Sequence, residues 1–257
     1  MKKLVNLFFI LALVAVGFTS CEEKKEVPDG IPGMGNTPGE LEIKEAFVAP
    51  EGITISGLEG IENVSTDATQ AQLKSSQFSF LRRGCGGSYY RHSFVAWIAV
   101  KLIFHNSNTG ERCVTLPQGL VFKVNKPGYQ NGLLVSPVKV CLEGNSRRTV
   151  SLYLMCINKG KEGAKADIKY SIEGITGAKK IWNLLNRLKG KKVNWEDYLA
   201  SLPSTQLKSA NADALEQYKE IADAIQNDIW TITNDGVDLS EEQLEYIESI
   251  PMLVDVQ

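Results

Sequence analysis

The strongest constraint on the fold is a change in hydrophobic period near Gly177. Upstream, from about residue 47 to 175, short β-branched and aromatic runs are separated by Gly, Asn and Pro. Such runs at short intervals predict an antiparallel sandwich or barrel. The predicted strands lie within SFVAWIAVKLIFH (93–105), ERCVTL (111–116), GLVFKV (119–124), GLLVSPVKVCL (132–142) and RTVSLYLMCI (148–157).

Downstream of Gly177 the apolar residues recur at helical spacing. Four helices are predicted, within GAKKIWNLLNRLKGKK (177–192), NWEDYLASLP (194–203), NADALEQYKEIADAIQNDIW (211–230) and SEEQLEYIESIP (240–251). Apolar steps of 3 and 4 define one face of the third helix, and Ser240 with Gln243 forms a capping-box pattern before the fourth. We therefore expect an α+β protein: an antiparallel β-sandwich or barrel-like part (46–175), followed by a helical subdomain packed on it (176–257).

The N-terminus reads as a lipoprotein signal peptide over residues 1–20. Lys2 and Lys3 precede LVNLFFILALVAVGF, whose length of about 15 residues is short of the roughly 20 that a membrane-spanning helix needs. The run ends at FTSC, which resembles the lipobox of bacterial lipoproteins, although Phe18 stands where leucine is usual. This resemblance implies that Cys21 carries palmitate-type acyl chains, which anchor a protein without a transmembrane helix. The alternative is an ordinary secretory signal with an incidental cysteine.

Residues 21–45 are rich in charge, Pro and Gly and poor in large apolar groups. Such a segment buries too little surface to offset its ordering entropy, so we expect a flexible tether. The acidic residues directly after Cys21 resemble the surface-export signals of Bacteroidota lipoproteins. We therefore expect an outer-membrane protein that is held by lipid and faces the cell surface.

The charge balance argues against nucleic acid as a partner. Without Lys2 and Lys3, 26 basic side chains remain against 30 acidic ones, a net charge near −4. Only two histidines are present, no Cys-x-x-Cys pair occurs, and no Gly-rich phosphate loop has the required form. We expect no metal, no cofactor and no catalytic set; a Cys85–His92 hydrolase pair is the nearest alternative.

Four cysteines follow Cys21, and in an exported protein they suggest two disulfides with three pairings. A hairpin centred on EGNSRR (143–148) would place Cys141 and Cys156 about 20 Å apart, too far for a disulfide. Alternation along VSLYLMC (150–156) puts the Cys156 side chain on the aliphatic face of its strand, so this thiol is expected to point into the core.

Two segments carry a more specific resemblance. IQNDIW (225–230) fits the pattern apolar-Gln-x-x-apolar-Trp, and LYLMCINKG (152–160) places a cysteine at a predicted strand end. Together, over roughly residues 148–236, they resemble the thioester domains of bacterial surface adhesins. Met155 departs from that family, in which Tyr, Phe or Leu usually precedes the cysteine, and the lipid anchor stands in place of a cell-wall sorting signal.

The resemblance implies that Cys156 and Gln226 form an internal thioester. Ala222 would leave space on one side of Gln226, and Trp230 would shield the other. A lysine amine of a host or envelope partner would then displace the sulfur and leave a permanent amide. Such a protein reacts once and is not an enzyme.

Two other interpretations remain open at this point. Gln226 can be a hydrogen-bonded glutamine at a helix–sheet interface, with Cys156 paired to Cys85 or Cys113. The protein would then be a noncovalent glycan- or protein-binding lipoprotein that presents Tyr89, Tyr90 and Tyr129 from its loops. A purely structural envelope subunit has no positive sign in the sequence.

Overall fold

A computed structural model describes residues 30–61, 98–194, 197 and 211–253 of the chain. The predicted signal peptide, Cys21, Cys85, Tyr89, Tyr90, His92 and nearly all of the predicted helix 194–203 lie outside these ranges. The strands are β1 (Ile43–Glu45), β2 (Ile53–Ile61), β3 (Ile98–Asn106), β4 (Arg112–Leu116), β5 (Leu120–Val124), β6 (Gly132–Leu133), β7 (Val138–Leu142), β8 (Arg147–Cys156) and β9 (Tyr170–Thr176). The helices are α3 (Lys179–Leu188), α5 (Asn211–Thr233) and α6 (Glu241–Ser249).

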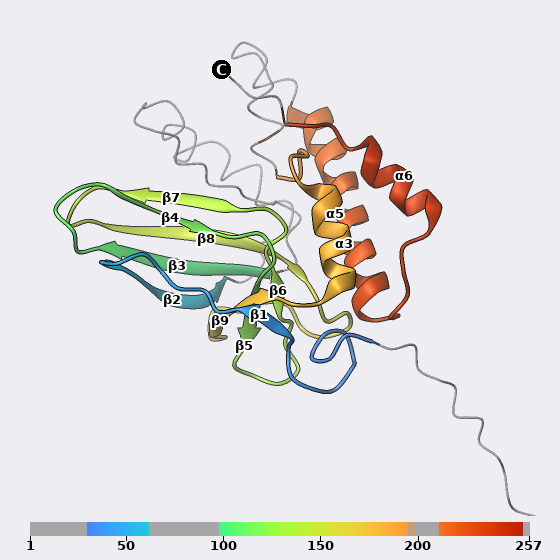
Figure 1. The fold of residues 1–257 in the computed structure, drawn as a ribbon, viewed down its shortest axis with the longest axis horizontal. Coiled ribbons are helices and arrows are strands. Elements are labelled where there is room, and N and C mark those ends of the chain that lie inside the picture. Colours follow the sequence, from blue (N-terminus) through green and yellow to red (C-terminus); the bar gives the residue numbers. More distant parts are fainter. Residues whose placement is uncertain (1–29, 62–97, 195–196, 198–210, 254–257) are drawn as a thin grey trace, which may run out of the picture.

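Seven strands form one antiparallel sheet in the order β1-β9-β5-β6-β8-β3-β2. The sheet curls, so that β2 approaches β9 through a bridge between Glu59 and Lys169 (Figure 1). Lys101 and Lys169 both form ion pairs with Glu59 at this junction. The curl produces the half-barrel that encloses the first of two cores.

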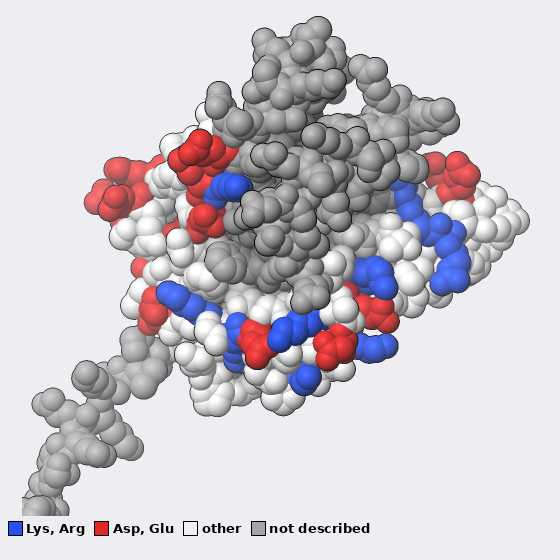
Figure 2. Space-filling model, turned by 180° about the vertical axis from the view of Figure 1, so that it is seen from behind, with Lys and Arg blue, Asp and Glu red and all other residues white. Residues whose placement is uncertain are grey.

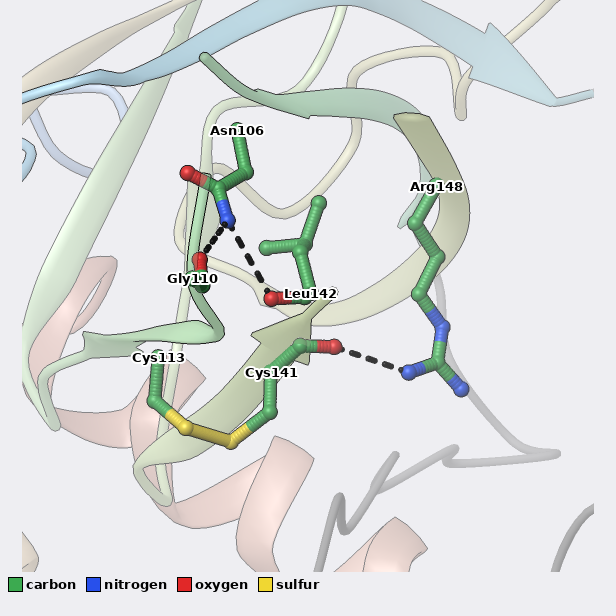
Figure 3. Close-up of a disulfide and its surroundings, with 6 residues drawn as sticks. All are labelled: Asn106, Gly110, Cys113, Cys141, Leu142 and Arg148. Carbon is green, nitrogen blue, oxygen red and sulfur yellow. Dashed lines mark hydrogen bonds between the residues drawn. A yellow bond between two sulfur atoms is a disulfide. The ribbon is translucent and has the colours of Figure 1, made fainter. Parts of the chain in front are cut away.

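β4 and β7 form a separate two-stranded ribbon that lies along one face of the curled sheet (Figure 1). The Cys113–Cys141 disulfide joins the two ribbon strands, and Arg148 of β8 donates a hydrogen bond to the Cys141 carbonyl (Figure 3). The hairpin expected at 143–148 is therefore wrong, because β7 pairs with β4 and β8 pairs with β3 and β6. The EGNSRR turn instead carries the chain from the ribbon to the sheet.

The space between the curled sheet and the ribbon is the sheet core. It includes Ile98, Leu102, Phe104, Val114, Leu116, Phe122, Val140, Leu152, Leu154, Cys156 and Tyr170. Most of these residues alternate with exposed or half-buried ones along their strands, as period-2 patterning predicts. Asn106, at the end of β3, donates to the carbonyl groups of Gly110 and Leu142 and so ties the sheet to the ribbon (Figure 3).

The helices form a second layer over the opposite face of the sheet, at the end where β8 finishes (Figure 1). Their apolar faces build the helix core with Val121, Leu133 and Met155 of the sheet; the helical members include Ile181, Leu184, Leu185, Leu188, Tyr218, Ala222, Ile225, Ile229 and Ile247. Ser240 caps α6 through the predicted capping box with Gln243. The predicted fold class, α+β with a barrel-like β part and a C-terminal helical part, is confirmed. Within the described ranges, no helix is long and apolar enough to cross a bilayer.

The tether predicted over 21–45 is wrong for its described residues, 30–45. Met34 is fully buried in the helix core, and Ile31 is 7% exposed. Ile43 and Glu45 pair with β9. The prediction failed because this stretch is stabilised by backbone hydrogen bonds and by a few apolar anchors rather than by a high apolar content.

Candidate functional site

Cys156 is the last residue of β8, and its side chain is fully buried. It shares the sheet core with Val150, Leu152 and Leu154, which confirms the predicted facing. Met155 points the other way, into the helix core. The end of β8 therefore lies between the two cores.

The thiol of Cys156 is free. Cys113, one of the partners that the sequence left open for it, is bonded to Cys141 at the far end of the ribbon. Glu111 lies beside that disulfide. Because the sulfur atoms of Cys113 and Cys141 are bonded to each other, they offer no thiolate to a metal ion.

Gln226 lies on α5 and is also fully buried. Its Nε2 donates to the Cys156 carbonyl at 2.8 Å, and its Oε1 accepts from the Cys156 N–H at 2.8 Å. The structure thus brings together two residues that are 70 positions apart. Both polar groups of the carboxamide are occupied by the backbone of the residue that bears the thiol.

This pairing completes the strand ladder of β8. The N–H of Ile157 donates to Asn131, on the side of β6. Because backbone groups alternate sides along a strand, the polar groups of Cys156 face the other way. The carboxamide of Gln226 binds them there as a neighbouring strand would, so helix α5 is held to the end of the sheet by two hydrogen bonds.

Asn158, two residues after Cys156, connects the site to the N-terminal segment of the chain. Its backbone N–H donates to Sγ of Cys156 at 3.3 Å. Its side-chain amide donates to the carbonyls of Gly33 and Gly35, and the N–H of Gly35 donates to Ile157 at 2.7 Å. We call residues 33–35 the clamp, because they bind the chain directly after the thiol.

Burial raises the pKa of the Cys156 thiol to about 11, and the Asn158 N–H and the Trp230 indole oppose that rise only in part. Burial in an apolar core disfavours the thiolate, so the resting group is an uncharged thiol. Trp230, one turn after Gln226, packs against the sheet core beside the thiol. Ala222, one turn before it, is buried in the helix core.

Three contacts between a lysine and an aromatic ring lie at this end of the sheet. The ammonium groups of Lys126 and Lys165 lie 5.1 and 5.5 Å from the ring centroid of Tyr129. Lys159 lies 5.3 Å from that of Trp230. The ring of Tyr129, predicted as a stacking platform for a glycan, is thus already in contact with two cations.

The sequence did not predict Asn158 as a residue of this site, or Tyr170 as a buried residue of the sheet core. Asn158 lies within LYLMCINKG (152–160), but its partners, Gly33 and Gly35, are more than 120 positions away. Tyr170 starts β9 and is 5% exposed, and its hydroxyl has no hydrogen-bond partner among the described residues. Alternation along KYSIEGI (169–175) is the one signal that could have placed its ring in the core.

A cavity of about 770 Å³ lies apart from this site, between α3 and α6. Leu184, Ile232 and Leu244 form part of its wall, with Lys180 and Glu248 among the charged groups. On the face seen in Figure 2, basic and acidic side chains are interspersed below the grey part. Among the described residues, Lys126–Asp167 and Lys123–Glu40 are ion pairs. The described residues on this face therefore form no single-sign surface for a polyanion.

Comparison with protein-family models, with curated proteins and with solved structures finds no match to this chain in any of the three. The geometry of Cys156 and Gln226 is therefore the basis for a functional conclusion. A thiol next to a carboxamide in an interface that excludes water can attack it, release ammonia and form a thioester. Alternatively, the carboxamide only holds α5 to β8 through its two hydrogen bonds.

Proposed function

We propose that this chain is a lipid-anchored surface protein that forms a thioester between Cys156 and Gln226 and uses it to bond covalently to an amine of a partner. The supporting observation is the pair of 2.8 Å hydrogen bonds between the Gln226 carboxamide and the Cys156 backbone. A partner at the cell surface, such as a host or envelope protein with an accessible lysine, fits this chemistry and the expected export route.

The hydrogen bonds also favour the reaction. Attack by Sγ on the side-chain carbon of Gln226 places negative charge on Oε1, and the Cys156 N–H already donates to that oxygen. The Cys156 carbonyl holds the nitrogen that departs. The C–N bond breaks, the thiol proton goes to that nitrogen, and ammonia leaves.

The second step releases the sulfur. An amine of the partner attacks the thioester carbonyl, the C–S bond breaks, and the amine loses a proton that restores the Cys156 thiol. The product is an amide between Gln226 and the partner. Burial of the thiol and the indole of Trp230 exclude water, which would otherwise hydrolyse the thioester.

Intact mass tests this proposal on freshly purified chain that lacks residues 1–21. We expect a mass lower than the sequence mass by one ammonia, beyond the two hydrogens lost in the Cys113–Cys141 disulfide, and we expect methylamine to add its own mass and expose one thiol. Cys156→Ala and Gln226→Ala should each show no ammonia deficit relative to the mass of their own sequence. Gln118→Ala is the matched control, because Gln118 also donates to two backbone carbonyls but lies away from the thiol.

A wild-type mass that lacks the two hydrogens of the disulfide but no ammonia would refute the thioester. Gln226 would then be a bracket between α5 and β8, and the noncovalent binding lipoprotein would take its place. Binding to the surface partner that survives methylamine treatment would support that second outcome.

A further inference from the structure

A smaller cavity, of about 400 Å³, lies beside the clamp. Its lining includes Gly33 and Gly35 of the clamp, Lys123 of β5, Asn131 and Lys161. Backbone and two basic residues therefore share one hollow at the surface. The proposed chemistry makes no use of this cavity.

Hydrogen bonds join the lining of this cavity to the two residues that follow Cys156. The carbonyl of Asn131 accepts from the N–H of Ile157 at 3.1 Å. The N–H of Lys161 donates to the carbonyl of Asn158 at 3.4 Å, and the N–H of Asn158 donates to Sγ of Cys156 at 3.3 Å. A group bound in the cavity would therefore lie beside the segment that carries the candidate thioester.

The positive charges in the cavity are only partly neutralised. Among the described residues Lys161 has no ion pair, whereas nearby Lys165 pairs with Glu162. Lys123 pairs with Glu40 at 3.5 Å, but the Glu40 side chain is 92% exposed, so water screens this pair strongly. Glu40 is the one carboxylate in the lining, and two lysines against it leave an excess of one positive charge.

Resting on the proposed function, we propose that this cavity binds a carboxylate of the partner protein and so directs the thioester to a lysine that has an acidic neighbour. A carboxylate in the cavity gains the attraction of Lys161 and competes with Glu40 for Lys123. The proposed reaction consumes an amine of the partner, so the group that positions that amine must belong to the same molecule. In a polypeptide, an aspartate or glutamate beside the lysine meets this requirement.

Binding of the carboxylate changes the rate of the covalent step and not its course. The lysine nitrogen bonds to the Gln226 carbonyl, the C–S bond breaks, and the proton that the amine loses restores the Cys156 thiol. The carboxylate holds the amine near the thioester, which raises its effective concentration there. An amine without an acidic neighbour still reacts, but more slowly.

Competition between two peptides tests this assignment on the full chain. Each peptide carries one lysine, flanked by glutamates in the first and by glutamines in the second. At about 0.01 M salt we expect the first to be incorporated about 3- to 10-fold faster, as for two partly exposed ion pairs. At about 1 M salt the ratio of the two rates should fall to about one, because the charges are then screened.

Two variants locate the preference. Lys161→Gln should bring the ratio of rates close to one at low salt. Lys126→Gln is the matched control, because Lys126 is also an exposed lysine of this end of the sheet but pairs with Asp167 and is not in the lining of the cavity. It should keep the wild-type ratio.

A noncovalent measurement separates the cavity from the thioester and does not require Lys161→Gln to fold. Cys156→Ala cannot form the thioester, and its amide NMR signals for residues 33–41 and Lys161 should shift with the glutamate peptide but not with the glutamine peptide. An ammonia-deficient wild type with equal rates for both peptides, or Cys156→Ala without these shifts, overturns the carboxylate site alone. A wild type with no ammonia deficit overturns the thioester, and the same shifts in Cys156→Ala would then still support the carboxylate site.

Discussion

At the scale of single residues, the helix layer contains a buried carboxylate. Asp228 of α5 is 4% exposed, and Gln243 donates to its Oδ1 at 2.7 Å. Burial raises the pKa of Asp228 from 3.8 to about 6, and the hydrogen bond from Gln243 opposes this only in part. The carboxylate is therefore charged at neutral pH in a place that favours its neutral form.

The sign of the pH effect follows from this raised pKa. The contribution of Asp228 to stability is fully present below pH 3.8 and is lost as the pH rises through about 6. Asp228→Asn keeps an acceptor for Gln243 without the charge. We expect this variant to be more stable at pH 7 by about 1 kcal/mol, after a discount for solvent screening.

Thermal unfolding between pH 4 and pH 8 checks this prediction. The wild type should lose stability relative to Asp228→Asn as the pH rises from about 4 to about 6, and the gap should then stay constant up to pH 8. An equal gap between the two proteins at every pH would show that the charge on Asp228 is not the cause.

The sequence identified part of the candidate site because that part is local. Gln226 and Trp230 share one helical turn, and the facing of Cys156 follows from alternation along one strand. Asn158 could not be assigned, because its role depends on contacts with a distant segment. The spacing of residues within one element does not encode those contacts.

At the scale of elements, the clamp links the N-terminal segment to both elements of the site. Gly35 binds Ile157 just after β8, and it lies against Thr233 and Asn234 at the end of α5. Residues 30–45 were predicted as a tether because they are rich in Gly and Pro. Glycines in this segment allow close packing against neighbouring residues. A high glycine content alone does not show whether a segment is flexible or closely packed.

Gly35→Ala should therefore destabilise the protein strongly. The φ angle of Gly35 is +57°, and an added Cβ would overlap the carbonyl oxygen of Thr233. We expect a loss of about 2–4 kcal/mol in unfolding free energy, measured by urea denaturation.

Gly128→Ala separates the cost of a side chain at positive φ from the cost of the steric overlap with Thr233. Gly128 has a φ of +88°, but its Cβ would meet nothing within 4 Å. It should show the conformational cost alone, about 1 kcal/mol. Equal losses for the two variants would show that the clamp makes no close contact with α5.

At the scale of the whole molecule, the disulfide and the candidate thioester lie at opposite ends of β8. Arg148, beside the Cys113–Cys141 bond, is eight residues from Cys156, or about 26 Å along the strand. The order of strands that produces this separation was not predictable from the sequence. Local patterning predicted strands and helices, but the separate ribbon β4–β7 depends on long-range pairing.

Removal of the disulfide should thus lower stability and leave the chemistry intact. A Cys113→Ala/Cys141→Ala variant frees a loop with a sequence separation of 28, and we expect a loss of about 3 kcal/mol in unfolding free energy. Its mass should still lack one ammonia under native conditions. Loss of the mass deficit in a folded double variant would contradict the independence of the two ends.

The most direct measurement of the central claim is a high-resolution crystal structure of freshly purified protein. We predict continuous electron density between Sγ of Cys156 and the side-chain carbon of Gln226, with no nitrogen left on that carbon. Separate density for an intact carboxamide, hydrogen-bonded to the Cys156 backbone and not covalently bonded to Sγ, would contradict the thioester.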